Sequence, residues 1–125
     1  MTEIQALLLI KSILESADIH GIEHMLSEDC EYMSTGRGII GRNRNETVEF
    51  LSSMTESIKA DNVPVTCKVM HITDVYEEDA LFHEGRHGLT VSYENNDNYV
   101  YMIFVDVNDK GLVDRIVSSQ ENYSI

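Results

Sequence analysis

The sequence contains few basic residues, two cysteines, one proline and no tryptophan. Lys and Arg number 9 against 22 Asp and Glu, so the formal net charge is −13. Nucleic acids and anionic membranes are bound by basic surfaces, so neither is expected as a partner of this acidic chain. Cys30 and Cys67 are too few to form a disulfide framework, and each lies in a strand-like run where a small buried thiol is expected.

A long hydrophobic run is also missing. The N-terminal segment MTEIQALLLIKSIL carries an acidic residue at Glu3, and Lys11 interrupts its apolar stretch. This pattern fits neither a secretory leader nor a membrane span, so a cytoplasmic location is expected. The 125 residues suit one domain, residues 1–125, with a single hydrophobic core. No cofactor is expected.

The first half of the chain has the spacing of helices. Apolar residues predict a first helix over residues 2–17, and Asp18 is expected to cap a second, short helix. A third helix is predicted from residue 43 or 45 to residue 60. Between the second and third helices we expect a short strand over residues 30–34 and then a glycine-rich loop that contains Gly36, Gly38 and Gly41.

After Pro64 the apolar residues alternate with a period of two. This alternation predicts strands over residues 65–76, 81–94, 99–107 and 112–122, joined by turn-rich segments. Helices followed by an antiparallel meander make an α+β arrangement. We therefore expect three N-terminal helices packed in a strongly curved, mostly antiparallel sheet.

Residues 83–87 read HEGRH, which matches the H-E-x-x-H motif of zinc hydrolases. That motif places both histidines on one face of a helix, but Gly85 and Gly88 disfavour a helix and the following residues favour a strand. On one face of a strand, His83 and His87 would lie roughly 13 Å apart. One zinc ion with Zn–N bonds of about 2 Å cannot bind both. A zinc hydrolase is thus a remote alternative, and no metal site is expected.

The stretch LSEDCEYMSTGRGIIGRNRNETVEFL, with its "GR…E" entry into a helix (Gly41, Arg42, Glu46), resembles the nuclear transport factor 2-like superfamily. That superfamily includes SnoaL-like polyketide cyclases, ketosteroid isomerases and scytalone dehydratase. The likeness in element order covers nearly the whole chain. It implies a cystatin-like α+β cone, in which a bent sheet encloses an apolar pocket. Many functions share this fold, so the fold alone does not decide the activity.

The resemblance also implies which positions would carry ketosteroid isomerase chemistry. The general base of that enzyme corresponds to Ser34, its oxyanion-hole tyrosine falls near Ile10, and its neutral carboxylic acid falls near Ile103. That carboxylic acid stays protonated at neutral pH because its site is apolar, and it can therefore donate a hydrogen bond. None of the three groups is present here, so steroid isomerisation by that mechanism is not expected.

The same alignment turns a set of side chains toward the pocket. Its candidate catalytic residues are His83, His87, Tyr32 and Asp74, because a carboxylate opposite an imidazole tunes it and a tyrosine can help to move a proton. The alternative is that they are hydrogen-bonded polar residues at the rim of a filled core. The candidate ligand-binding residues are Ser34, Tyr99, Tyr101, Ile103, Ile116 and Gln120, and Leu81, Gly85, Leu89 and Ser118 are also expected to face inward.

The strand predicted over residues 99–107 is apolar on both faces, which indicates that both are covered. Its outward residues would be Val100, Met102 and Phe104, joined by Val69, Val75 and Phe82 from neighbouring strands. An exposed apolar patch of this kind usually marks an interface, so a homodimer packed through the outer sheet face is expected.

Two functional hypotheses follow. The first is a SnoaL-like pocket protein that binds a small, mostly apolar metabolite, with acid–base isomerase, cyclase or dehydratase chemistry as its potential activity. The second is a non-catalytic dimeric binding or scaffold module whose cavity is partly filled by its own side chains. An open pocket lined by hydrogen-bonded polar groups would favour the first hypothesis, and a collapsed cavity the second.

Overall fold

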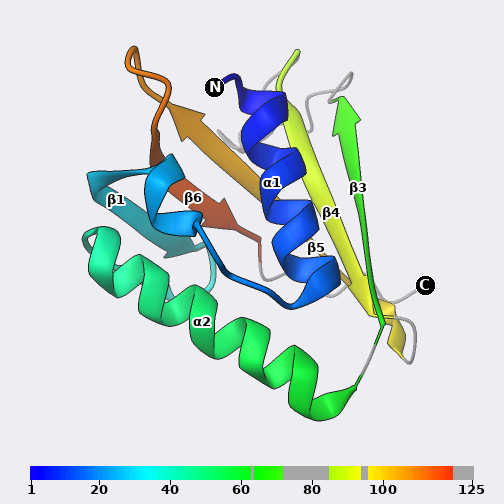
Figure 1. Cartoon of the computed structure of the whole chain (residues 1–125). Coiled ribbons are helices and arrows are strands. Elements are labelled where there is room, and N and C mark those ends of the chain that lie inside the picture. The colour runs from blue at the N-terminus through cyan, green and yellow to red at the C-terminus, as the bar shows by residue number, and fades with distance from the viewer. Residues whose placement is uncertain (63, 72–84, 94–95, 120–125) are drawn as a thin grey trace.

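Six strands form one sheet, and two α-helices cover one of its faces (Figure 1). The computed structural model describes residues 1–62, 64–71, 85–93 and 96–119, with the backbone alone for residues 96–100. Within these residues the elements are α1 (Glu3–Ser16), η1 (Ile22–Met25), β1 (Leu26–Ser34), β2 (Gly38–Gly41), α2 (Arg44–Asp61), β3 (Val65–His71), β4 (His87–Tyr93), β5 (Asn96–Val107) and β6 (Val113–Ser118).

The strand order is β2-β1-β6-β5-β4-β3, in which β1 and β6 run parallel and every other neighbouring pair is antiparallel. The expected α+β class with a mostly antiparallel sheet is therefore confirmed. Helix α1 packs on β3, β4 and β5, whereas α2 packs on β1 and β2. Together the two helices leave the opposite face of the sheet without a helix in the described part of the chain (Figure 1).

The prediction of three α-helices is wrong, because the segment after Asp18 forms a turn and then a single 3₁₀ turn, η1. Ala17 ends α1 in the left-handed conformation with φ of 54°, and Gly21 has φ of 83°. The Asp18 carboxylate accepts a hydrogen bond from the His20 backbone N–H at 3.0 Å, which closes a local turn instead of capping a helix. Two left-handed residues this close together leave no room for a helix of useful length.

Helix α1 is held to the sheet by its apolar stripe and by a carboxylate near each end. The Glu3 carboxylate accepts a hydrogen bond from the His87 backbone N–H at 2.9 Å, and the Glu15 carboxylate accepts one from the Cys67 backbone N–H at 2.9 Å. The Lys11 ammonium and the Cys67 N–H lower the pKa of Glu15. The stripe between these two contacts consists of Ala6, Leu7, Ile10, Ile13 and Leu14.

The "GR…E" segment builds the junction between β1, β2 and α2. Asn43 caps α2 by accepting a hydrogen bond from the Glu46 N–H at 2.9 Å, and the Glu46 carboxylate accepts one from the Arg42 N–H at 3.2 Å. The buried Thr47 hydroxyl donates to the Cys30 carbonyl at 2.9 Å. A Cβ at Gly41 would lie 2.8 Å from the Thr47 hydroxyl oxygen, so a glycine is required where the helix meets the sheet.

Several expected strand positions differ in the structure. Strand β1 starts at Leu26, earlier than expected, and β4 starts at His87 because Gly85 lies in a turn with φ of 85°. Gly85 therefore does not face the pocket as a strand residue. The expectation that Val69 lies on the outer face is wrong, because it pairs with the core residue Leu89 and packs against the inner hydrophobic core.

The outer face of β5 is less exposed than expected. Phe104 is fully buried and Met102 is 9% exposed, and neither belongs to the core cluster beneath the helices. The Arg86 guanidinium lies over the Phe104 ring, 5.0 Å from its centroid, and bonds the Asp106 carboxylate at 3.1 Å. Met102 and Phe104 therefore do not form the exposed patch that the sequence suggested. The expected contributions of Val75, Phe82 and the Val100 side chain lie outside the described residues.

Replacement of Gly41 by alanine tests the junction. The new Cβ would collide with the Thr47 hydroxyl and with its backbone nitrogen at 2.9 Å, so we expect the free energy of unfolding to fall by about 1–3 kcal/mol in urea titrations. Arg42→Ala is the matched control, because the Arg42 contact uses only the backbone N–H, and its effect should stay within about 0.5 kcal/mol. Equal stability of Gly41→Ala and the wild type would contradict this account of the junction.

Candidate functional site

One row of side chains crosses the inner face of the sheet at the end of β1. Leu89 pairs with Ile103, Ile103 with Ser118, and Ser118 with Ser34, in register across four neighbouring strands. Residues paired in register share a face, so the row ends in two adjacent serines. All four side chains are at most 2% exposed. Ile103 and Ser34, two candidate ligand-binding residues, thus belong to one buried row.

The hydroxyl of Ser34 has no hydrogen-bond partner among the described residues, although its side chain is 1% exposed. Buried polar groups in native proteins are nearly always paired, so an unpaired one calls for a bound molecule or water. The Ser27 hydroxyl and the Arg86 Nε atom share this lack of a described partner, but they lie outside the Ser34 row. Ser34 is therefore the most informative polar group on the inner face.

Two tyrosines add hydroxyl groups near the Ser34 row. The Tyr101 and Tyr93 hydroxyl oxygens lie 3.4 Å apart, and the Tyr101 hydroxyl donates to the Met54 sulfur of α2 at 4.0 Å. Tyr101 is 5% exposed and lies two residues before Ile103 on β5, in the neighbouring row of the same face, where it pairs with Val91. We call Ser34, Ser118, Tyr93 and Tyr101 the hydroxyl layer.

Tyr32 and Ile116 pair in register and belong to the inner-face row on the other side of the Ser34 row from Tyr101. Tyr32 is 1% exposed, and its ring lies 4.6 Å from the Phe50 ring of α2, centroid to centroid. Ile116 is fully buried in the core cluster. Both side chains face inward as expected, but their surroundings are those of packed core residues.

His87 lies at the start of β4, where α1 begins. Its Nδ1 atom is 3.1 Å from a Glu3 carboxylate oxygen, and the same oxygen accepts the hydrogen bond of the His87 backbone N–H. The ring of His71, the in-register partner on β3, lies 4.9 Å from the His87 ring, centroid to centroid. The sequence alone did not indicate a role for Glu3 or His71. Val69 and His71 share one face of β3, so the expectation that turned Val69 outward turned His71 outward as well.

The structure does not bring His87 and Tyr32 together. They lie on β4 and β1, and β5 and β6 run between these strands. Three strand spacings of about 4.8 Å separate them by roughly 14 Å across the sheet. His83, Asp74 and Gln120 lie outside the described residues, as does the side chain of Tyr99, so the expected Asp74–His83 pair stays a prediction.

Both cysteine thiols are unsuited to nucleophilic chemistry. Burial raises the pKa of the Cys30 thiol to about 12, with Asp114 and Glu31 adding to the rise. Burial and the Glu15 carboxylate raise the pKa of Cys67 to about 12 as well. Reactive cysteines need a lowered pKa, so the two residues are structural thiols, as their positions in the strands suggested.

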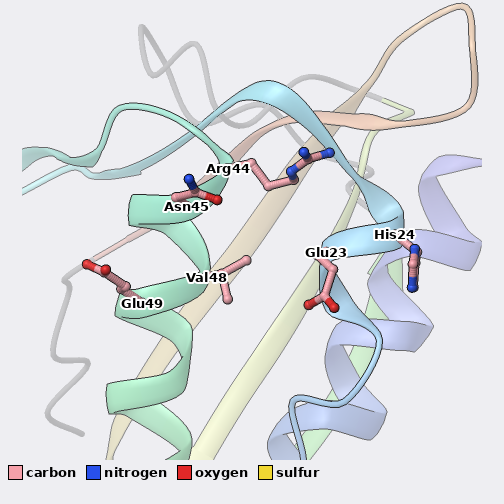
Figure 2. A pocket seen from close by; sticks show the side chains of 6 residues that line it. All are labelled: Glu23, His24, Arg44, Asn45, Val48 and Glu49. Carbon is pink, nitrogen blue, oxygen red and sulfur yellow. The ribbon is translucent and has the colours of Figure 1, made fainter.

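An open groove lies between η1 and the first turns of α2 (Figure 2). Its volume is about 520 Å³, and its lining mixes acidic and basic side chains: Glu23, His24, Arg44, Asn45, Val48 and Glu49. In Figure 2, Arg44 and Val48 extend from α2 toward η1, whereas Glu49 points away from η1. The groove contains none of the candidate residues predicted from the sequence, and its side chains do not converge on one point.

The described part of the chain holds neither a metal centre with three protein ligands nor a membrane-crossing helix. No group of three or more His, Cys, Asp or Glu residues there has the arrangement that a metal ion requires. None of the described helices combines the length and the apolar character that a membrane crossing requires.

The fold matches solved structures, whereas no family model and no curated protein matches the sequence. An uncharacterised bacterial protein with a cystatin-like fold from Silicibacter pomeroyi matches with a TM-score of 0.66 and 14% identity, over 94% of this chain and 74% of that one. A steroid delta-isomerase from Pseudomonas aeruginosa matches with a TM-score of 0.65 and 11% identity, over 94% and 77%. The epoxide hydrolase/cyclase-like enzyme SalBIII, described in pyran ring formation, matches with a TM-score of 0.63 and 12% identity, over 95% and 90%.

Other matching chains are described as NTF2-like or SnoaL-like proteins. The fold expected from the sequence resemblance, that of the nuclear transport factor 2-like proteins, is therefore confirmed. At these identities the matches establish the fold alone.

The thiol assignments can be tested by chemical modification. With a pKa of about 12, only roughly 10⁻⁴ of each thiol is ionised at pH 8, so Ellman's reagent should label the native protein far more slowly than the urea-unfolded protein. The raised pKa values also make stability depend on pH. Unfolded thiols ionise from about pH 9 upward while the folded ones stay neutral, so the free energy of unfolding should fall between pH 9 and 12. Rapid labelling of the native protein at pH 8 would contradict the assignment.

Proposed function

We propose that the protein binds a small, largely apolar metabolite on the inner face of the sheet, beside the hydroxyl layer. The observation that carries this proposal is the buried Ser34 hydroxyl without a described partner. Leaving a buried donor and acceptor unpaired costs about 1–3 kcal/mol. A carbonyl or hydroxyl group of a ligand would supply the missing hydrogen bond, with residues 1–125 acting as one binding domain.

The surroundings of Ser34 favour a ligand without a charge. The described side chains of its row and of the Tyr101 row offer hydroxyl groups and hydrocarbon, with the Met54 sulfur on the helix side. None of these side chains is acidic or basic in the described part of the two rows. A buried charge without a counter-ion is strongly unfavourable, so a neutral ligand suits this site.

Proton transfer of the isomerase, cyclase or dehydratase type is the second candidate function. Its support is the carboxylate–imidazole contact between Glu3 and His87, together with the fold shared with a steroid delta-isomerase and a cyclase-like enzyme. Because His87 lies far from Tyr32, this activity would depend on the candidate residues His83 and Asp74.

A binding or scaffold module without catalysis is the third candidate. The packing of Tyr32 on Phe50 supports it, because side chains of the protein itself fill that part of the inner face.

Ser34→Ala separates a ligand-binding hydroxyl from a structural one. Removal of an unpaired buried hydroxyl should raise the free energy of unfolding of the ligand-free protein by about 1 kcal/mol. The matched control is Thr47→Val, which removes a buried hydroxyl that donates to the Cys30 carbonyl and should lower stability by about 1–3 kcal/mol. Urea denaturation of both variants makes the comparison. A loss of stability in Ser34→Ala as large as in Thr47→Val would contradict the proposed role.

The ligand itself can be sought in protein purified from its natural host, by mass spectrometry of the small molecules released on denaturation. We expect a neutral compound in the wild type, and a reduced amount in Ser34→Ala and Tyr101→Phe. Thr66→Ala is the control, since Thr66 lies on the outer side of β3 and should leave the amount unchanged. Equal amounts in the wild type and both inner-face variants would contradict the proposed site.

The homodimer through the outer sheet face stays a prediction. In the described part of this face, Met70 and Ile39 are exposed apolar residues, with exposed fractions of 44% and 48%. If the outer face forms the interface, Met70→Lys should shift the protein from dimer to monomer in sedimentation velocity at micromolar concentration. A monomeric wild type would rule the dimer out.

A further inference from the structure

We propose that His71 and His87 bind one Zn²⁺ ion at the end of the β3–β4 pair, and that Glu3 is the positioning residue for His87. The two histidines face each other across the antiparallel strands, with ring centroids 4.9 Å apart. This pair is different from the H-E-x-x-H spacing, because it joins two strands. It also lies apart from the hydroxyl layer, so it does not depend on the proposed ligand.

The distance between the two rings suits a shared ion. A Zn–N bond of about 2.0–2.1 Å places the ion roughly 3.2 Å from an imidazole centroid. Two imidazoles that meet at a zinc ion with an angle between 90° and the tetrahedral value then have centroids about 4.5–5.2 Å apart. The observed 4.9 Å lies in that interval.

Glu3 prepares His87 for metal binding. Its carboxylate oxygen lies 3.1 Å from Nδ1 and is itself fixed by the His87 backbone N–H at 2.9 Å. An ionised carboxylate at this position accepts a hydrogen bond from a protonated Nδ1, which leaves the lone pair on Nε2 for a metal ion. Metal-binding histidines commonly donate their second ring N–H to a carboxylate in this manner. The contact therefore orients the ring and selects the required tautomer.

The site is open to solvent and chemically suited to zinc. His71 is exposed, and the side chains of His87 and Glu3 are 26% and 33% exposed. Neutral imidazole is a favoured ligand of zinc. With no described group of three ligating residues, water completes the coordination shell of a site with two protein ligands. An ion here would link β3 to β4, and through Glu3 also to the first turn of α1.

Titration of tag-free protein with Zn²⁺ tests the site. By isothermal titration calorimetry we expect one ion per chain, and Zn²⁺ should also raise the melting temperature, because an ion that binds only the folded state stabilises it. His71→Ala and His87→Ala should each weaken binding by about tenfold or more and remove the thermal shift, since even the loss of an outer-shell partner commonly costs 10- to 100-fold. Glu3→Gln keeps an oxygen for the His87 N–H but should weaken binding as well.

His24→Ala is the matched control, because His24 is an exposed histidine near the start of β1, away from the β3–β4 pair. It should bind Zn²⁺ like the wild type. The absence of one-to-one binding in the wild type would overturn the proposal. The proposal would also be overturned if His71→Ala bound Zn²⁺ with wild-type affinity. His71 is exposed, so this variant should fold normally. A loss of binding in His24→Ala equal to that in His71→Ala would overturn it as well. None of these outcomes bears on the ligand proposed at Ser34.

Discussion

The arrangement of the molecule depends on how α1 is fixed across the inner face of the sheet. The apolar stripe of the helix supplies most of the buried area, but such contacts alone would permit sliding along the strands. Glu3 and Glu15 remove this freedom, because each accepts one backbone N–H from the sheet. Burying an unpaired N–H is costly, so a shift of the helix would be penalised at both ends.

The Glu15 contact also resolves a problem of the sheet. Strand β3 is an edge strand within the described order, and an edge strand exposes N–H groups that can pair with another chain. Glu15 covers the Cys67 N–H, and the negative charge near Cys67 contributes to its raised pKa. The same carboxylate thus positions the helix, protects the edge and adds to the effect of burial on the pKa of the Cys67 thiol.

The sequence was sufficient for the features that depend on local periodicity. The apolar spacing of α1, the helix predicted to begin at residue 43 or 45, and the alternation that turns Ser34, Tyr101, Ile103 and Ile116 inward all appear in the structure. The second helix failed because left-handed conformations at Ala17 and Gly21 outweighed a weak apolar pattern. Val69 was assigned to the wrong face because an alternating strand does not state which of its faces meets the helices.

Features that depend on register between distant segments could not be read from the sequence. The contact of Glu3 with His87 joins residues 84 positions apart, and the approach of His71 to His87 depends on the pairing of β3 with β4. The burial of Phe104 is of the same kind, because it involves Arg86, which directly precedes β4. Each of these contacts follows from the fold as a whole and has no local signature.

The HEGRH segment shows how the difference between local spacing and strand register affects the interpretation of a motif. A motif defined along the chain is meaningful only in the secondary structure for which its spacing was defined, and His87 begins a strand. In a sheet, the nearest neighbours of a side chain lie across strands, at about 5 Å, whereas residues four apart on one strand are more than twice as far away. Among the described residues, His71 and Glu3 lie close enough to act with His87.

Two different chemical environments lie on one face of the sheet. Around Ser34, serine and isoleucine stand where the resemblance to ketosteroid isomerases places a base and an acid, so hydrogen bonding to a neutral molecule is the chemistry that these side chains can provide. Imidazole and carboxylate groups come together instead at the outer end of β3 and β4, beside the first turn of α1. Binding of an apolar ligand and binding of a cation would then be independent properties, because Leu89 and Ile103, which separate His87 from the two serines of the Ser34 row, are buried hydrocarbon side chains.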